Sequence, residues 1–197
     1  MLLHTHPDYV RAQHVGYSVR LVADIAAHYN DALDALDTLK SMCMLDAFYV
    51  HIRLLTEFLV RTQGSRDFSP EDFDVDWSAP VGEPADRLLA TWDVASKHVV
   101  HFGQRRLPSA SDDERQFTVN AAHFRLLATD ALGFYAAFVD AAAAAAPAWS
   151  KGALIPDPAR EPEDWAARVR SDVVRELREA QAYAQRSLAG PSWLSGS

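Results

Sequence analysis

The chain has 197 residues, of which 49% are apolar and 23% are charged, and its formal net charge is −8. This composition argues against a disordered chain, and a domain of this length can bury a core without disulfides or a structural metal. The acidic balance argues against broad electrostatic binding to nucleic acid, which requires a basic face, although it leaves room for a small basic cleft.

The sequence contains no recognisable targeting or membrane segment. Residues 1–20 carry charged and histidine side chains throughout and lack the apolar core of a signal peptide. The most hydrophobic run, residues 141–146, consists of alanine alone and is too short to span a bilayer. We therefore expect a cytoplasmic protein that does not contact a membrane.

Helical periodicity dominates the first third of the chain. A first helical region is predicted over residues 8–38, with a bend near Gly16. A second helix is predicted over 42–63, capped by Thr38 or Ser41 and ended by Gly64. The only cysteine, Cys43, lies in an apolar part of this helix and is expected to be a buried small hydrophobe.

Residues 64–84 form a long acidic connection. Three prolines forbid a continuous helix here, while Phe73 and Trp77 suggest that the segment is pinned to the body. We expect an ordered loop, a candidate wall or lid, whose two aromatic rings pack against the second and third helices.

Three further helices are predicted. The third runs from Pro84 to about residue 102, the fourth from about Ser111 to the alanine run, and a highly charged fifth from Glu161 to about Leu188. The pattern predicts an all-α bundle of four to five helices with a long ordered loop between the second and third helices. Residues 1–188 would form a single domain, followed by a flexible tail over 189–197.

Two segments carry residues suited to chemistry. In the second helix, His51 shares a face with Leu54 and Phe58, and Arg53 can pair with Glu57 one turn further on. By itself this segment is typical of a core helix with an exposed ion pair and a half-buried histidine.

The second segment ends the third helix. Lys97, His101 and Arg105 recur at intervals of four and can line one helix face. The cations would hold an anion such as phosphate, while the imidazole could transfer a proton near neutral pH. The alternative is that basic side chains simply favour the C-terminus of a helix.

A metal site was weighed as well. His51, His98, His101 and His123 lie on helices expected to be neighbours, and helical bundles do hold histidine-ligated metals. However, His98 and His101 have no acidic partner in the same helix. We therefore expect no metal and no other cofactor.

Taken together, the segment from His51 to Phe58, the acidic loop with Asp72, Phe73 and Trp77, and the run from Ser96 to His101 resemble a group of bacterial helical proteins. In that group the last motif reads Asn-Lys-x-Val-Ala-His. This motif is similar to the signature of the HEPN superfamily: an arginine, a polar residue, three variable residues and a histidine. The resemblance covers roughly residues 42–106.

The resemblance implies a compact helical bundle, commonly dimeric, that belongs to a defence or toxin–antitoxin system. In catalytic relatives, the motif arginine and histidine of two protomers meet and cleave RNA without metal. Here His101 matches the histidine and Lys97 the polar position, whereas Ser96 stands where the arginine would be. Arg53 or Arg105 could supply the missing cation. The partners implied are a second copy, RNA or a cognate protein.

Two alternatives remain open from the sequence. The chain could be a non-catalytic interaction or dimerisation module, for which the apolar seam of the charged final helix would be suited. It could also be a metal-dependent helical-bundle enzyme that uses His51, His98 and His101 or His123.

Overall fold

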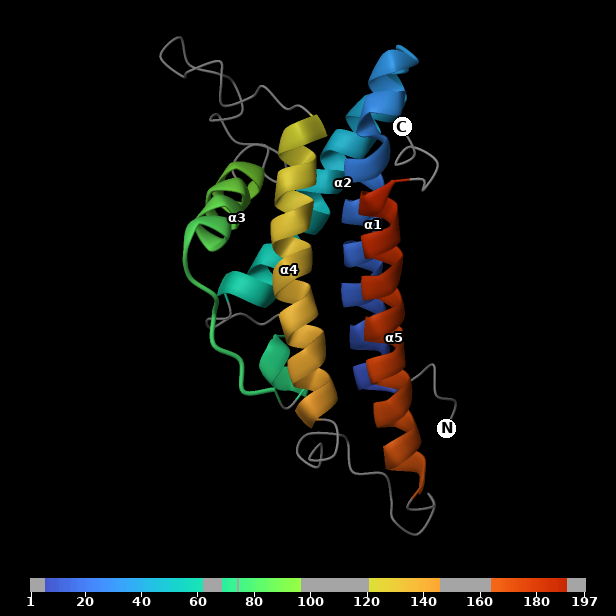
Figure 1. The fold of residues 1–197 in the computed structure, drawn as a ribbon, viewed down its shortest axis with the longest axis vertical. Coiled ribbons are helices and arrows are strands. Elements are labelled where there is room, and N and C mark those ends of the chain that lie inside the picture. The colour runs from blue at the N-terminus through green and yellow to red at the C-terminus, as the bar shows by residue number, and fades with distance from the viewer. Residues whose placement is uncertain (1–5, 62–68, 74, 97–120, 146–163, 191–197) are drawn as a thin grey trace.

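The computed structural model describes residues 6–61, 69–73, 75–96, 121–145 and 164–190 (Figure 1). Five α-helices account for most of these residues: α1 (Pro7–Asp34), α2 (Thr38–Thr56), α3 (Glu83–Val94), α4 (Ala121–Ala145) and α5 (Asp164–Ala189). No β-strand occurs among them. The predicted all-α bundle of four to five helices is therefore confirmed.

The two longest helices, α1 and α5, lie side by side and run in the same direction (Figure 1). Gly16 makes the close approach possible, because a Cβ atom built on it would lie 3.1 Å from Cβ of Ala180. Arg20 pairs with Glu176 at 2.8 Å further along the same seam. Gly16 therefore lies at a helix contact inside a continuous α1, and the predicted bend is replaced by close packing.

Helix α4 occupies the centre of the bundle and packs against the other four α-helices. Its Phe124 ring stacks on Phe48 of α2 with centroids 3.9 Å apart, and its Phe138 ring meets Phe58 edge-on at 4.9 Å. Within the described chain, α4 alone is long and apolar enough to span a membrane by length and composition. Of the most apolar 18 residues of α4, 39% are buried in the bundle.

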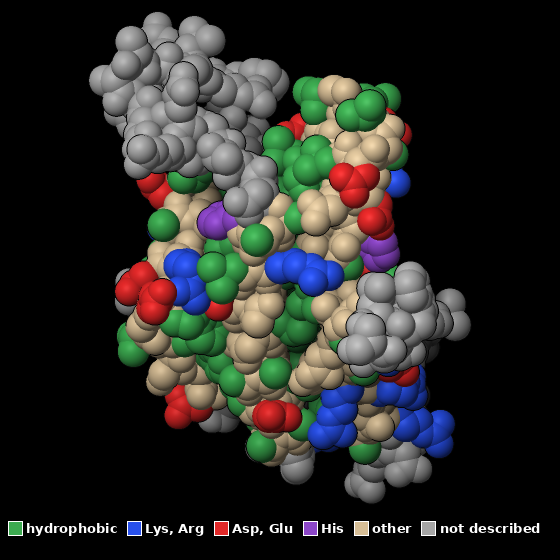
Figure 2. Space-filling model, turned by 45° about the horizontal axis from the view of Figure 1, so that its top comes forward, with side chains coloured by type: hydrophobic (Ala, Val, Ile, Leu, Met, Phe, Trp, Pro, Cys, Tyr) green, Lys and Arg blue, Asp and Glu red, His purple; other side chains and the backbone are tan. Residues whose placement is uncertain are grey.

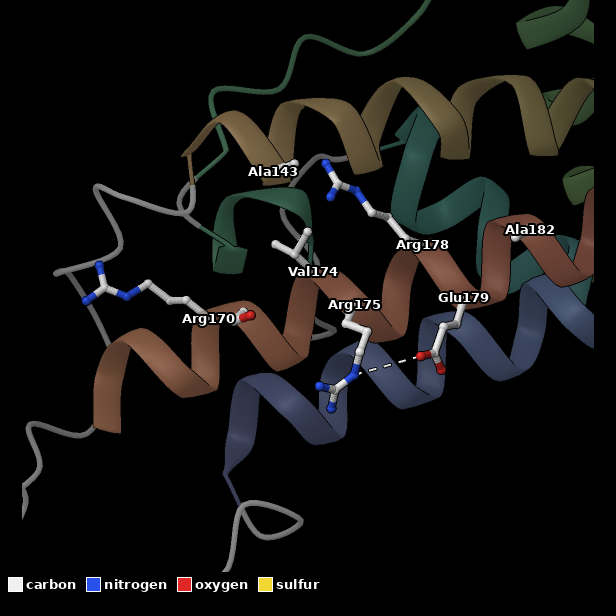
Figure 3. Close-up of a pocket in the computed structure, with 8 residues that line it drawn as sticks. Ala143, Arg170, Val174, Arg175, Arg178, Glu179 and Ala182 are labelled. Atoms are coloured by element: carbon white, nitrogen blue, oxygen red, sulfur yellow. Dashed lines mark ion pairs between the residues drawn. The ribbon is translucent and has the colours of Figure 1, made fainter. Parts of the chain in front are cut away.

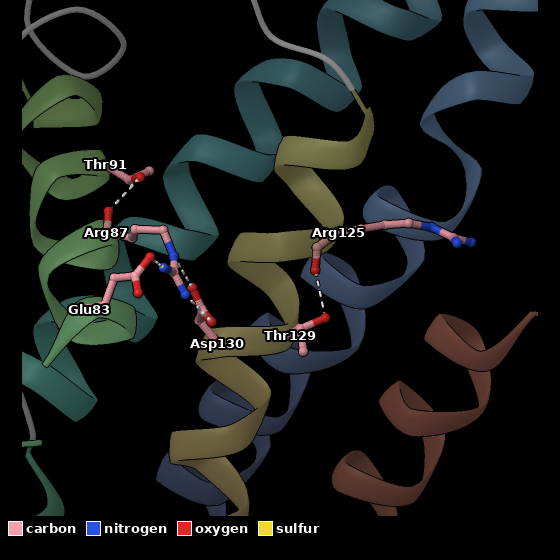
Figure 4. A network of polar contacts seen from close by, with 6 residues as sticks. All are labelled: Glu83, Arg87, Thr91, Arg125, Thr129 and Asp130. Carbon is pink, nitrogen blue, oxygen red and sulfur yellow. Dashed lines mark hydrogen bonds and ion pairs between the residues drawn. The ribbon is translucent and has the colours of Figure 1, made fainter.

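An ion pair joins α3 to α4 (Figure 4). The Nε and Nη2 atoms of Arg87 donate hydrogen bonds of 2.9 and 3.0 Å to the two carboxylate oxygens of Asp130. Arg87 also bonds Glu83 one turn earlier on α3. This two-pronged contact is the geometry that favours arginine over lysine, and it raises the pKa of the guanidinium further.

Helix α2 begins earlier than predicted, because the N-cap is Asp37, which accepts a hydrogen bond of 2.9 Å from the backbone N–H of Lys40. Carboxylates stabilise this position well, so Asp37 takes the role predicted for Thr38 or Ser41. The helix then continues as a π-helical turn, η2 (Glu57–Arg61). The predicted stop at Gly64 lies outside the described residues.

The π-turn corrects the face predicted for His51, Leu54 and Phe58. Leu54 is 43% exposed, whereas Phe58 is buried in the core and His51 is half-buried. A π-turn inserts extra residues per turn, so side chains that follow it are rotated relative to those before it. Phe58 therefore points into the bundle, although ordinary helical spacing would place it beside Leu54.

The described part of the connection before α3 is pinned to the bundle by its two aromatic rings. The indole N–H of Trp77 donates a 2.8 Å hydrogen bond to the Leu59 carbonyl of η2. The rings of Phe73 and Trp77 pack edge-on against Phe138 of α4, at 5.4 and 6.1 Å. The predicted contact with the second helix is confirmed, and both rings also pack against α4.

Two apolar residues near the start of α2 are exposed, and one of them, Cys43, was predicted to be buried. Cys43 is exposed, because the inward face of α2 is filled by Phe48, Tyr49 and Ile52. Leu36 is 88% exposed and has a positive φ of 54°. That left-handed conformation costs a leucine about 1–2 kcal/mol, and Leu36 gains no burial in return.

Candidate functional site

Of the four residues predicted to form a catalytic site, the structure describes Arg53. Lys97, His101 and Arg105 lie outside the described residues, as does His98. Arg53 lies on α2, three residues before its end, and its side chain is 23% exposed. Its surroundings are therefore the part of the candidate site that the structure defines.

Arg53 is held by Glu57, as the sequence predicted. Its Nη2 atom donates a 2.9 Å hydrogen bond to Oε1 of Glu57, one turn further on. The same carboxylate oxygen accepts a 2.9 Å bond from the indole N–H of Trp92 on α3. Glu57 thus bridges an arginine of α2 to a tryptophan of α3, and the three side chains form one polar cluster between these helices.

Arg53 also contacts the first position of the predicted motif. Its Nε atom donates a 3.0 Å hydrogen bond to Oγ of Ser96. Ser96 directly precedes Lys97 and stands where the motif of the resembled family has arginine. A guanidinium group from α2 therefore lies beside Ser96.

A second arginine completes the cluster. The guanidinium of Arg61, at the end of η2, lies over the ring of Trp92 with its Cζ atom 3.7 Å from the ring centroid. Arginine favours such stacking because its planar cation is attracted to the face of the indole. Arg61 is exposed with respect to the described residues.

The cluster of Arg53, Glu57, Arg61, Trp92 and Ser96 is suited to binding a phosphate. It contains two guanidinium groups against one carboxylate, so it keeps a net positive charge. Arg53 donates to Ser96 and Glu57, and its remaining N–H groups have no acceptor among the described residues. Guanidinium N–H groups bind phosphate oxygens in a fork-like geometry.

Sequence reasoning missed Arg61 and Trp92. The signal that could have found Arg61 is the spacing of Arg53, Glu57 and Arg61 at intervals of four, which places alternating charges along one helix face. Trp92 had no comparable signal, because its role depends on how α3 packs against η2. π-helical turns such as η2 are often found at functional sites, and their presence is difficult to read from sequence.

His51 belongs to a separate contact on the α1 side of α2. Its Nδ1 atom lies 3.0 Å from Oγ of Ser18, and its ring meets Tyr17 edge-on at 5.4 Å. The Ser18 hydroxyl also lies 3.2 Å from the His14 carbonyl, to which it can donate. Burial lowers the pKa of His51, which keeps this imidazole neutral.

The part of the chain that the structure describes contains no set of side chains that could act as metal ligands. Among the described residues, no three His, Cys, Asp or Glu side chains gather closely enough to hold an ion. His51 is bonded to Ser18, and the other histidines of the metal hypothesis are His98 and His101, outside the described residues, and His123 on α4. The described residues therefore assign no metal ligand.

A second basic surface lies along α5, where an open hollow of about 580 Å³ is lined by Arg170, Arg175 and Arg178 together with Val174 and Ala143 (Figure 3). Arg175 is paired within its own helix, with Asp172 and, at 3.8 Å, with Glu179. These are local contacts of an exposed helix face. We therefore regard this surface as solvated, and the cluster around Arg53 as the candidate site.

Comparison of the chain with protein-family models, with curated proteins and with solved structures gives no match. The functional interpretation accordingly depends on the residues and their geometry.

Proposed function

We propose that this chain is a HEPN-like helical domain of a bacterial defence or toxin–antitoxin system, and that it cleaves RNA without a metal ion. The observation that carries the proposal is the 3.0 Å hydrogen bond from Arg53 to Ser96. It places a guanidinium group beside Ser96, the position at which the resembled motif has an arginine. We also propose that the protein is cytoplasmic.

Each residue of the proposed site has a defined role. His101 acts as the general acid/base that moves protons to and from the reacting oxygens. Lys97, Arg53 and Arg105 bind the phosphate and stabilise the negative charge that grows on it in the transition state. Glu57 positions Arg53 by accepting a hydrogen bond from it. Trp92 in turn holds Glu57, because its indole N–H donates to the same carboxylate oxygen.

The proposed chemistry uses the ribose 2′-hydroxyl of the substrate. A base removes its proton, the 2′-oxygen attacks the adjacent phosphorus, and the bond from phosphorus to the 5′-oxygen breaks. An acid returns a proton to that leaving oxygen. DNA has no 2′-hydroxyl, so the proposed reaction is specific for RNA.

The test is cleavage of single-stranded RNA by the purified chain in the presence of EDTA. We expect cleavage of RNA and none of DNA of the same sequence. His101→Ala should lower the rate by about 10²- to 10⁴-fold while leaving the thermal unfolding midpoint close to that of the wild type. Intact RNA after prolonged incubation with the wild-type protein, with or without added metal, contradicts the proposal.

A second candidate is a non-catalytic interaction module. The observation that favours it is the number of exposed apolar side chains on α2 and on the turn before it, among them Leu36, Leu39 and Met42. Figure 2 shows hydrophobic side chains gathered at the end of the molecule formed by that turn. The seam of α5, suggested for this role by the sequence, is instead buried against α1 and α4.

A further inference from the structure

Arg61 is turned away from the carboxylate that its place in the sequence would give it. It stands four residues after Glu57, a spacing that pairs opposite charges on a regular α-helix. Residues Glu57–Arg61 form a π-helical turn, in which that register is lost. Glu57 accordingly pairs with Arg53 at 2.9 Å, and the Arg61 guanidinium lies over the Trp92 ring, with Cζ 3.7 Å from its centroid.

The stacked position leaves the N–H groups of Arg61 unused within the described part of the chain. Stacking occupies the face of the guanidinium, whereas its N–H groups lie in the plane of the group. Among the described residues, none forms a hydrogen bond or an ion pair with Arg61. The ring of Trp92 is itself fixed by its 2.9 Å bond to Glu57, so the cation above it is held in a defined place.

The contacts between α2 and α3 place Arg61 on one particular side of Glu57. Arg53 bonds Ser96, just after α3, and Glu57 bonds Trp92, four residues earlier. The two segments are therefore antiparallel, and a step forward along η2 is a step back along α3. Arg61, four residues beyond Glu57, lies on the side away from Ser96. The two arginines thus serve two positions, one beside the motif that Ser96 begins and one further from it.

We propose that Arg61 binds the phosphate next to the one that is cleaved, so that the site holds two successive phosphates of one RNA strand. This second position rests on the proposed ribonuclease function and extends it. Arg53 contacts the phosphate that reacts, and Arg61 contacts its neighbour. A guanidinium donates two parallel N–H bonds to a phosphate, so each arginine has the groups needed for one phosphate.

The two arginines then differ in what their removal does to cleavage. The neighbouring phosphate keeps its charge and shape throughout the reaction, so its contact with Arg61 is equally strong in the bound substrate and in the transition state. Loss of that contact raises KM and leaves kcat unchanged, whereas loss of Arg53 lowers kcat.

The direct test uses strands that bind but cannot react. Oligonucleotides of 2′-O-methyluridine lack the attacking hydroxyl, so their binding is measured apart from cleavage. The dinucleotide has a single phosphate, and the hexanucleotide has several. Arg61→Gln removes the charge but keeps a planar group beside Trp92. In titration calorimetry it should weaken hexanucleotide binding by about tenfold and leave dinucleotide binding unchanged.

The salt dependence identifies the contact as one with a phosphate. Each phosphate contact to a single strand contributes about 0.7 to the slope of log Kd against log salt concentration, so Arg61→Gln should lower the slope by about that amount. Arg61→Lys keeps the charge and should retain the wild-type slope. The matched control is Arg125→Gln, at an exposed position of α4, which should change neither the affinity nor the slope.

Equal weakening of both oligonucleotides by Arg61→Gln overturns the second position, because both arginines would then contact one phosphate. An unchanged affinity or salt slope for the hexanucleotide overturns it too, as does a wild-type chain that fails to bind the hexanucleotide. Length-dependent binding by a wild-type chain that leaves unmodified RNA intact would support two phosphate positions and contradict the ribonuclease function, so the two proposals fail separately.

Discussion

The Nε atom of Arg53 and the Oγ atom of Ser96 lie 3.0 Å apart, although the two residues are 43 positions apart in the chain. The contact depends on two features of the fold: the packing of α2 against α3, and the anchoring of Arg53 by Glu57 one turn further on. It joins the two segments in which the sequence concentrates its chemistry, and it is the basis of the proposed phosphate site.

The anchoring of Arg53 predicts a specific effect of changing Glu57. Glu57→Gln keeps the shape of the side chain but removes the charge that Arg53 and Trp92 share. We expect a loss of about 1 kcal/mol in the free energy of unfolding, since both partners are partly solvated. We also expect a change in tryptophan fluorescence, because the indole of Trp92 loses its charged acceptor.

Glu83→Gln is the matched control for that measurement. Glu83 pairs with Arg87 within one helix and is 85% exposed. Its replacement should leave both the free energy of unfolding and the fluorescence nearly unchanged. Equal effects of the two variants would show that Glu57 is an ordinary surface ion-pair partner.

Two glycines predict opposite effects of adding a side chain. Gly16→Val inserts a branched side chain where even a Cβ atom would lie 3.1 Å from Ala180, and we expect a loss of about 1–3 kcal/mol. Gly133 lies in α4, and apart from its own helix no described residue has an atom within 4 Å of the added Cβ, so Gly133→Ala should gain up to about 1 kcal/mol from helix propensity. Urea unfolding of both variants measures the difference, and a Gly16→Val protein as stable as the wild type would contradict the α1–α5 contact.

The anchoring of the connection before α3 predicts that two substitutions of Trp77 lower the free energy of unfolding to different extents. Trp77→Phe retains an aromatic ring but leaves the Leu59 carbonyl without its 2.8 Å donor, for an expected loss of about 1 kcal/mol. Trp77→Ala also removes the ring from Phe138 and should cost about 3 kcal/mol or more. Both values are measured by chemical unfolding, and similar losses for the two variants would mean that the ring packing contributes little.

The pH dependence of stability follows from two histidines. Burial lowers the pKa of His51 and of His123 below the ordinary value of 6.5. The unfolded chain therefore takes up protons more readily than the folded chain. The free energy of unfolding should be undiminished above about pH 6.5 and should fall as the pH decreases below that value.

His51→Asn tests the first of these contributions, because an asparagine amide can hydrogen-bond to Ser18 in place of Nδ1 and does not titrate. Its stability should fall less than that of the wild type between about pH 7 and pH 5. Parallel pH profiles for the two proteins would mean that His51 is not the group responsible.

The sequence predicts the fold class and most of the core because helix periodicity is a local signal. The positions of Phe48, Ile52 and Leu59 follow from spacings of three and four, and the Arg53–Glu57 pair follows from a spacing of four. The same rule fails after Glu57, where the π-turn rotates Phe58 inward. It fails at Cys43, because an apolar residue on α2 can lie on either of two apolar faces.

The candidate site was predicted only in part, for a physical reason. Arg53 was identified from its own helix, but its bond to Ser96 and the stacking of Arg61 on Trp92 depend on how α2, η2 and α3 pack together. Such contacts between distant segments have no periodic signal in one sequence. The loop contacts illustrate the same point, since Trp77 and Phe73 pack on η2 and α4, and the sequence predicted only the first of these.

The most direct test of the account compares two arginine variants in an RNA cleavage assay. Arg53→Ala removes the guanidinium at the proposed phosphate site, while Arg125→Ala removes one from an exposed position on α4 that projects away from the Arg87 network (Figure 4). Single-turnover rates are measured in EDTA, with the protein in excess over the RNA and at a concentration above the dissociation constant of the complex. The account predicts that Arg53→Ala slows cleavage by about 10²-fold or more and that Arg125→Ala cleaves at the wild-type rate. Equal rates for the two variants would contradict the central claim that Arg53 supplies the cation for the motif around His101.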